Sequence, residues 1–187
     1  MFDSAVLGVD PGLSRCGFAV AERGTNRPVC RSAGVIRTHP DEALPMRLLE
    51  LESQLGQLCD EFTPGRIAIE RVLFQANART AMAVGQASGI AMLVAARRGI
   101  PVVMFSPNEV KLALTGDGCA DKQQIQAMLP RVFDLAEPIR QADAADALAL
   151  AFCGLHGGGT HLSRTGTAST ASPRLAAAIA AAVRSSS

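Results

Sequence analysis

The sequence has little of what marks secreted, membrane-spanning or zinc-binding proteins. Its five cysteines are odd in number and form no Cys-x-x-Cys pair, so we predict reduced thiols, with neither a disulfide framework nor a zinc site. The longest apolar stretch, residues 87–96, falls well short of the roughly 20 residues that cross a bilayer. The first residues lack the basic start of a signal peptide. We therefore expect a soluble, cytoplasmic protein.

Lysine and histidine are scarce as well. The two lysines are Lys111 and Lys122, and arginine is used everywhere else. His39, His156 and His161 lie outside any motif, and we expect each of them at the surface. The sequence therefore offers neither an obvious side-chain nucleophile nor a catalytic histidine.

The net charge of +1 at first argues against a nucleic-acid-binding protein, because such domains are usually basic. The charges are nevertheless segregated along the chain. Residues 41–61 and 132–156 are acidic, whereas residues 62–131 and 157–187 are basic. Such a chain can place a cationic surface beside an acidic cluster, as a nuclease requires.

A chain of 187 residues predicts one domain with a self-sufficient hydrophobic core. We place this domain at residues 1–156. From Gly157 onward the composition turns to Gly, Ser, Thr and Ala, which predicts a flexible C-terminal tail over residues 157–187.

Hydrophobic periodicity predicts the element order β-β-β-α-β-α-β-α-α-α. Strands are expected at residues 5–10, 17–21, 29–37, 66–70 and 101–105, the first three as an antiparallel group. Helices are expected at residues 41–61, 77–98, 106–116, 121–133 and 141–153. Ser106, Pro107 and Glu109 have the spacing of a capping box. The order indicates an α/β fold, a mixed five-stranded sheet with helices on both faces.

Four acidic residues occupy positions where acids are unexpected. Asp10 and Glu70 each end an apolar strand, and Asp143 and Asp146 lie three residues apart in an Ala-rich helix, on one face. Structural roles stay open for single members, because Asp before Pro-Gly is common in turns and Glu70 has Arg71 beside it. Two acids on one apolar helix face are harder to explain without a cation between them.

Together the four acids predict a site for hard metal ions. Oxygen ligands without nearby His or Cys suit Mg²⁺, or Mn²⁺ as a substitute, rather than Zn²⁺. Such clusters support two-metal phosphodiester hydrolysis, in which one ion activates a water molecule and the other stabilises the leaving oxygen. The protein side chains then need only hold the two ions.

Six sequence blocks occur in order between residue 5 and about residue 155. They are GVDPG (8–12), IAIER (67–71) followed by Asn77, GQASG (85–89), SPNEVK (106–111), TGDGCADK (115–122) and QADAADALALA (141–151). The series resembles the RuvC family of bacterial Holliday junction resolvases in both order and spacing. DPG alone would be a weak signal, whereas six ordered blocks are highly specific.

The resemblance implies an RNase H-like fold, a homodimer, and Mg²⁺-dependent nicking of two like-polarity strands at a four-way DNA junction, which leaves ligatable ends. It also implies action together with the RuvA–RuvB branch-migration complex. The family's four catalytic acids, which hold metal ions or orient the attacking water, fall on Asp10, Glu70, Asp143 and Asp146.

The family's basic residues near the scissile phosphate fall on Lys111 and Lys122, although two ordinary surface lysines would look the same. The family commonly has a phenylalanine three residues after the catalytic glutamate, where it stacks on a junction base. This sequence has Leu73 there, followed by Phe74. Either Phe74 stacks, or the contact that opens the junction is weaker, or both side chains belong to the core.

Further DNA contacts are expected from Asn77 and Arg79, and arginine contacts to phosphate would make binding sensitive to salt. The Ala- and Gly-rich segment 76–96 permits close approach of another helix. It is therefore either the dimer surface or a core helix rich in small residues.

Three alternatives are less well supported. The segment 8–20 also resembles the first phosphate loop of actin-like kinases and ATPases, but those enzymes need two related lobes and this chain has the length of one. A YqgF-type resolvase is nearer, yet the Asp143 and Asp146 pair and the two lysines favour RuvC. A non-catalytic junction-binding protein would have no reason to keep four converging acids.

Overall fold

The computed structural model describes residues 5–71 and 78–162, and its strands form one mixed sheet. Across the sheet these are β3 (Pro28–Arg37), β2 (Arg15–Arg23), β1 (Val6–Asp10), β4 (Arg66–Glu70), β5 (Val102–Phe105) and β6 (Thr160–His161). β1, β2 and β3 are antiparallel neighbours, whereas β1, β4 and β5 run parallel. The predicted N-terminal antiparallel group and the mixed sheet are confirmed.

The sheet has one strand more than the five predicted. Thr160 and His161 form β6, which pairs antiparallel with β5 at the edge of the sheet. The three glycines at 157–159 all have positive φ, a conformation in which glycine pays no steric penalty, and they turn the chain back toward β5. Two exposed polar residues after a glycine run have no strand periodicity, so the strand had no signal in the sequence. Residues 163–187 of the predicted tail lie outside the described residues.

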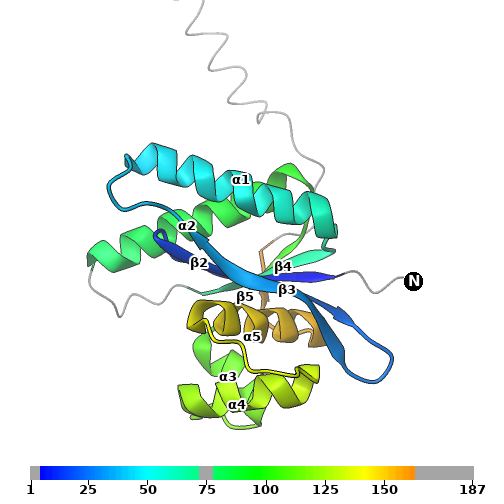
Figure 1. Cartoon of the computed structure of the whole chain (residues 1–187). Helices are drawn as coiled ribbons and strands as arrows, with labels where there is room; N and C mark the ends of the chain where they lie inside the picture. Colours follow the sequence, from blue (N-terminus) through cyan, green and yellow to red (C-terminus); the bar gives the residue numbers. More distant parts are fainter. Residues whose placement is uncertain (1–4, 72–77, 163–187) are drawn as a thin grey trace, which may run out of the picture.

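Helices cover both faces of the sheet (Figure 1). Their bounds are α1 (Leu44–Phe62), α2 (Ala78–Arg97), α3 (Pro107–Thr115), α4 (Lys122–Phe133) and α5 (Ala142–His156). α1 and α2 lie on one face, α5 packs on the other, and α3 and α4 lie beyond α5. None of the helices within the described ranges is long and apolar enough to cross a bilayer.

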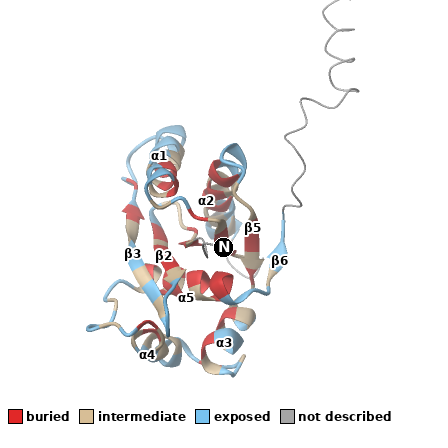
Figure 2. Cartoon of the chain, turned by 90° about the vertical axis from the view of Figure 1, so that its right-hand side faces the viewer, coloured by how far each residue is buried: buried red, intermediate tan, exposed pale blue. Residues whose placement is uncertain are grey.

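Each face of the sheet has its own hydrophobic core (Figure 2). On the side of α1 and α2, the buried cluster includes Leu7, Leu51, Leu55 and Ile69. On the side of α5, the cluster includes Val103 of β5 and Leu148 of α5, together with residues of α3, α4 and the other strands. α5 is more buried than the other helices, because its Ala-rich sequence is apolar on nearly every face. It is therefore held between the sheet and the outer helix pair.

Two glycines let α5 lie unusually close to the sheet. A Cβ at Gly8 would come within 2.0 Å of the Ala147 carbonyl oxygen, and a Cβ at Gly17 would come equally close to the Asp143 carbonyl oxygen, at 2.0 Å. The helix can approach this closely only because Gly8 in β1 and Gly17 in β2 have no side chain. The close approach places the first turns of α5 directly beside the end of β1, where Asp10 lies.

Reciprocal caps fix where α3 and α4 begin. The predicted capping box at α3 is present, with the Ser106 amide donating to the Glu109 carboxylate at 2.7 Å and the Glu109 amide donating to Ser106 Oγ at 3.3 Å. α4 has a second box, between Asp121 and Gln124. Because the box satisfies the free amides at a helix start, Lys122 is fixed as the first residue of α4.

Candidate active site

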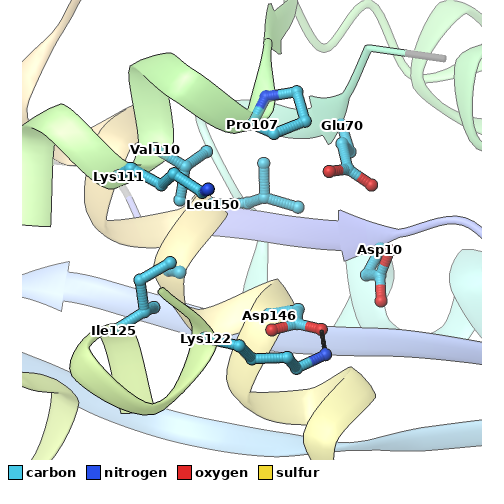
Figure 3. Close-up of a pocket in the computed structure, with 10 residues that line it drawn as sticks. Asp10, Glu70, Pro107, Val110, Lys111, Lys122, Ile125, Asp146 and Leu150 are labelled. Carbon is cyan, nitrogen blue, oxygen red and sulfur yellow. Dashed lines mark hydrogen bonds and ion pairs between the residues drawn. The ribbon is translucent and has the colours of Figure 1, made fainter. Parts of the chain in front are cut away.

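Three of the four predicted acids meet at the carboxyl ends of neighbouring parallel strands. Asp10 is the last residue of β1 and Glu70 the last residue of β4, and α5 brings Asp146 to the same edge. The open cavity there has a volume of about 210 Å³ (Figure 3). It is lined by Asp10, Glu70, Pro107, Val110, Lys111, Lys122, Ile125, Asp146, Ala149 and Leu150. The carboxyl edge of parallel strands is where α/β folds bind ligands.

In this cavity, each carboxylate disfavours the ionised form of its neighbours. The pKa of Asp10 is raised to about 7, first by its burial and then by repulsion from Glu70, Asp146 and Asp143. Burial and the charge of Asp146 likewise raise the pKa of Glu70. Several acids in a poorly solvated site carry more negative charge than the protein around them balances. The cluster is therefore electrostatically suited to bind cations.

Both predicted lysines line this cavity. Lys122 donates from Nζ to Asp146 Oδ2 at 2.7 Å (Figure 3). That hydrogen bond, together with the other nearby carboxylates, raises the pKa of Lys122 and keeps it charged. Lys111 enters the cavity from α3, on the side away from Lys122. The two cations come from different helices and line the same cavity as Asp10, Glu70 and Asp146.

Asp143 lies beside the cluster with its carboxylate held by another cation. Arg15, at the start of β2, donates to Asp143 Oδ2 from Nε at 2.8 Å and from Nη2 at 2.5 Å. Asp143 does not belong to the lining of the cavity described above. Its charge still contributes to the raised pKa of Asp10. The structure therefore places Asp143 within electrostatic range of Asp10.

The sequence left open that Glu70 serves only as an ion-pair partner of Arg71. The structure does not support this alternative, because the side chain of Arg71 contacts other residues. Arg71 hydrogen-bonds Thr160 and approaches the Glu109 carboxylate at 3.9 Å. The carboxylate of Glu70 instead points into the cavity (Figure 3).

Sequence reasoning missed Arg15 and the apolar wall of the cavity. The wall consists of Pro107, Val110, Ile125 and Leu150. Nothing in the spacing of Arg15 connects it with Asp143, which is 128 residues away. The wall residues belong to α3, α4 and α5, where each reads only as part of an apolar helix face.

Four predicted DNA contacts cannot be placed. Leu73, Phe74 and Asn77 lie outside the described residues. Arg79 belongs to α2, but its side chain is also outside the described part of the molecule.

The donor set suits a hard divalent cation, being made of carboxylate oxygens without sulfur or imidazole. Burial, and after it repulsion between the carboxylates, raises the pKa of Asp10 and of Glu70, and a bound cation would offset both effects. Within residues 5–71 and 78–162, no three His, Cys, Asp or Glu side chains are grouped closely enough to hold an ion as they stand. Lys122 and Arg15 pair with two of the four acids instead.

The chain has close relatives of known name. A family model described as crossover junction endodeoxyribonuclease RuvC matches residues 6–154. The protein of that name from Salinispora arenicola is 54% identical over 156 residues, which are 83% of this chain and 89% of the relative. The one from Thermobifida fusca is 50% identical over 149 residues, 79% of this chain and 82% of the relative.

Two solved structures that resemble this chain are also RuvC proteins. The structure of T. thermophilus RuvC in complex with Holliday junction substrate has a TM-score of 0.76 and 31% identity, and the match covers 80% of this chain and 91% of that chain. A second structure of Thermus thermophilus RuvC gives 0.77 and 30%, with 84% and 99% covered. The predicted RNase H-like fold is thus confirmed, and the chain belongs to the RuvC family of crossover junction endodeoxyribonucleases.

Proposed function

We propose that this protein is a Mg²⁺-dependent Holliday junction resolvase. As a homodimer, it nicks two strands of like polarity symmetrically at a four-way DNA junction during recombination and repair. The observation that carries the proposal is the meeting of Asp10, Glu70 and Asp146 with two lysines at one sheet edge, in a chain of the RuvC family. Relatives bear the name crossover junction endodeoxyribonuclease, and a RuvC of similar structure is bound to a Holliday junction.

The acids are proposed to hold the metal ions, with Asp10, Glu70 and Asp146 facing the cavity and Asp143 at its border. When bound, two divalent cations would supply activation of a water molecule and stabilisation of charge on the leaving oxygen. Mn²⁺ has the same preference for oxygen ligands and is the expected substitute. The site residues of this chain position the ions and the phosphate; none of them is required as a covalent nucleophile.

Lys111 and Lys122 are proposed to bind the scissile phosphate from opposite walls of the cavity. Both have ammonium groups on flexible stems, which suits them to follow a phosphate as it moves. Lys122 also holds Asp146 in place before DNA arrives. The alternative, two ordinary surface lysines, does not explain why both line the same cavity.

Replacing Lys122 by alanine should slow junction cleavage about 10- to 100-fold, the usual loss when one charged donor to a reacting phosphate or oxyanion is removed. Folding should change little, because the pair with Asp146 is partly exposed. Single-turnover cleavage with saturating enzyme measures the rate, and light scattering measures the dimer. Gln123→Ala, one residue further along the same exposed turn, is the matched control. Loss of the dimer in Lys122→Ala would instead assign the lysine a structural role.

A homodimer is proposed because two symmetric nicks require two active sites. One face of α2 is buried in the core through Ala87, Ala91 and Val94. The opposite side leaves Met82 66% exposed, and a Cβ at Gly85 would meet nothing within 4 Å. A glycine without a packing role in its own protomer supports the use of α2 as the dimer surface.

The remaining contacts are proposals that follow the family pattern. Base stacking by Leu73 or Phe74 and contacts by Asn77 and Arg79 concern residues of which the structure describes no side chain. Action with the RuvA–RuvB branch-migration complex is proposed on family membership. The cytoplasmic location expected from the sequence stays a prediction, as does the division into a domain at residues 1–156 and a tail.

The experiment that tests the function compares three DNA substrates of the same sequence: a mobile four-way junction, a linear duplex and a single strand. With Mg²⁺, we expect paired nicks in two strands of like polarity of the junction and at least a hundredfold slower cutting of the duplex. EDTA should abolish cleavage, and Mn²⁺ should restore it. Equal cutting of junction and duplex would contradict a junction-specific activity.

A further inference from the structure

The two acids of α5 are held by different cations. Asp146 faces the cavity and pairs with Lys122, which lines the same cavity. Asp143, one helical turn earlier, is bound by both Nε and Nη2 of the Arg15 guanidinium. Both of these hydrogen bonds end on a single oxygen, Oδ2. The guanidinium compensates the charge of Asp143 and holds Oδ2 between two of its donors.

Asp143 lies next to the cluster although it does not line it. A Cβ at Gly17 would meet the carbonyl oxygen of Asp143 at 2.0 Å and the Cβ of Asp10 at 3.2 Å. Asp143 and Asp10 therefore flank the same glycine. The backbone of Asp143 thus lies close to Asp10, while its carboxylate is bound to Arg15.

Arg15 reaches Asp143 from the first position of β2, directly after a firmly held loop. The preceding residue, Ser14, accepts a hydrogen bond from Arg47 at 2.6 Å, and its carbonyl oxygen accepts one from the Thr38 amide at 3.3 Å. Thr38 also donates from Oγ1 to the Leu13 carbonyl oxygen at 2.6 Å. The side chain of Arg15 is nevertheless 46% exposed. The backbone before Arg15 is held in place, whereas the guanidinium is half-exposed. The guanidinium can therefore exchange one hydrogen-bond partner for another without a movement of the backbone.

We propose that Arg15 is a positioning residue that competes with divalent cations for Asp143. In the free protein it holds the carboxylate away from the other acids. A DNA phosphate is a strong alternative partner for the exposed guanidinium donors, so junction binding would draw Arg15 off and release Asp143 to the cluster. Metal loading would then be coupled to substrate binding. This inference rests on the proposed function, because it assumes that Asp143 takes part in holding the ions.

The test measures Mn²⁺ binding to the free full-length protein by electron paramagnetic resonance of the unbound ion. Arg15→Gln should tighten the weaker Mn²⁺ site about tenfold, since the carboxylate no longer has a competing cation. Arg15→Lys keeps a positive charge at the same place and should return the affinity to within about threefold of wild type. The matched control is Arg37→Gln, which removes the same charge from the residue directly opposite Arg15 across the β2–β3 pair. It should change the affinity by less than about twofold.

A second titration adds an uncleavable junction analogue. Wild type should then bind Mn²⁺ about tenfold more tightly than without DNA, whereas Arg15→Gln should gain much less. Three outcomes would overturn the inference: unchanged or weaker Mn²⁺ binding in Arg15→Gln, equal tightening in Arg37→Gln, or an Arg15→Lys affinity equal to that of Arg15→Gln. Because these readouts require no cleavage, they separate failure of this inference from failure of the proposed nuclease activity, which the three-substrate comparison tests.

Discussion

Replacing Asp10 by asparagine is expected to reduce junction cleavage by at least about a thousandfold while junction binding persists. Asp10 is the acid on which the other three act: Glu70, Asp146 and Asp143 all raise its pKa. An amide has nearly the same shape but lacks the charge that a hard cation requires. The rate is measured by single-turnover cleavage in Mg²⁺, and binding by mobility shift in EDTA.

The matched control is Glu137→Gln, which makes the same chemical change in a side chain that is 76% exposed and paired only with a neighbour on its own segment. We expect its cleavage rate to equal that of wild type. Unchanged cleavage by Asp10→Asn would remove Asp10 from the catalytic group. Loss of junction binding together with cleavage would point to a role in DNA recognition instead.

The same substitution should stabilise the protein when no metal is present. The pKa of Asp10 is about 7 in the folded protein, compared with 3.8 for the ordinary side chain. The folded state therefore binds this proton more tightly than the unfolded chain does. The contribution of Asp10 to stability is most favourable below about pH 4 and is lost as the pH rises through about 7. Glu70, whose pKa is also raised, acts in the same direction.

At pH 8 in EDTA, Asp10→Asn should therefore gain on the order of 2–4 kcal/mol over wild type. This corresponds to a melting temperature roughly 5–10 °C higher for a chain of this size. Near pH 4 the two proteins should melt together. Scanning calorimetry from pH 4 to 8 measures the difference, with Glu137→Gln expected to follow wild type throughout. A variant less stable than wild type at pH 8 would show that the ionised carboxylate stabilises the fold.

The loss of cleavage and the gain of metal-free stability expected for Asp10→Asn have the same cause, because the site trades stability for metal binding. A site that gathers carboxylates around Asp10 lowers the stability of the metal-free protein, because the charges repel one another in a poorly solvated place. The same gathering provides the ligands that a pair of divalent cations needs. Lys122 and Arg15 reduce the cost in the free protein by pairing with Asp146 and Asp143. The three-substrate comparison and the Mn²⁺ titrations test the two sides of this compromise separately.

Local patterns are sufficient for most of the element boundaries. The leucines of residues 44–58 recur at helical spacing, and α1 runs from Leu44 to Phe62. Ser106 and Glu109 predict the start of α3 because a capping box depends on neighbours three residues apart. The strand ends at Asp10 and Glu70 are equally local, since each is a charged residue closing an apolar run. Such features need no knowledge of the rest of the fold.

The candidate acids are also recognisable because they contradict their surroundings. A carboxylate at the end of a buried strand, or two on an alanine-rich helix, is costly unless something compensates it. That anomaly alone singles out Asp10, Glu70, Asp143 and Asp146 as one group. The ordered blocks around them indicate the RuvC family, and the family match over residues 6–154 confirms it.

The sequence by itself thus determined the fold class and the family and singled out the four candidate acids, because each rests on local periodicity or on motifs in order. Only the tertiary structure decided how the acids are compensated: Lys122 holds Asp146 inside the cavity, while Arg15 holds Asp143 beside it. It also decided that Thr160 and His161 extend the sheet. Ion pairs and edge strands join residues far apart in the chain, and their partners are set by the distances that folding creates. No spacing along the sequence specifies those distances.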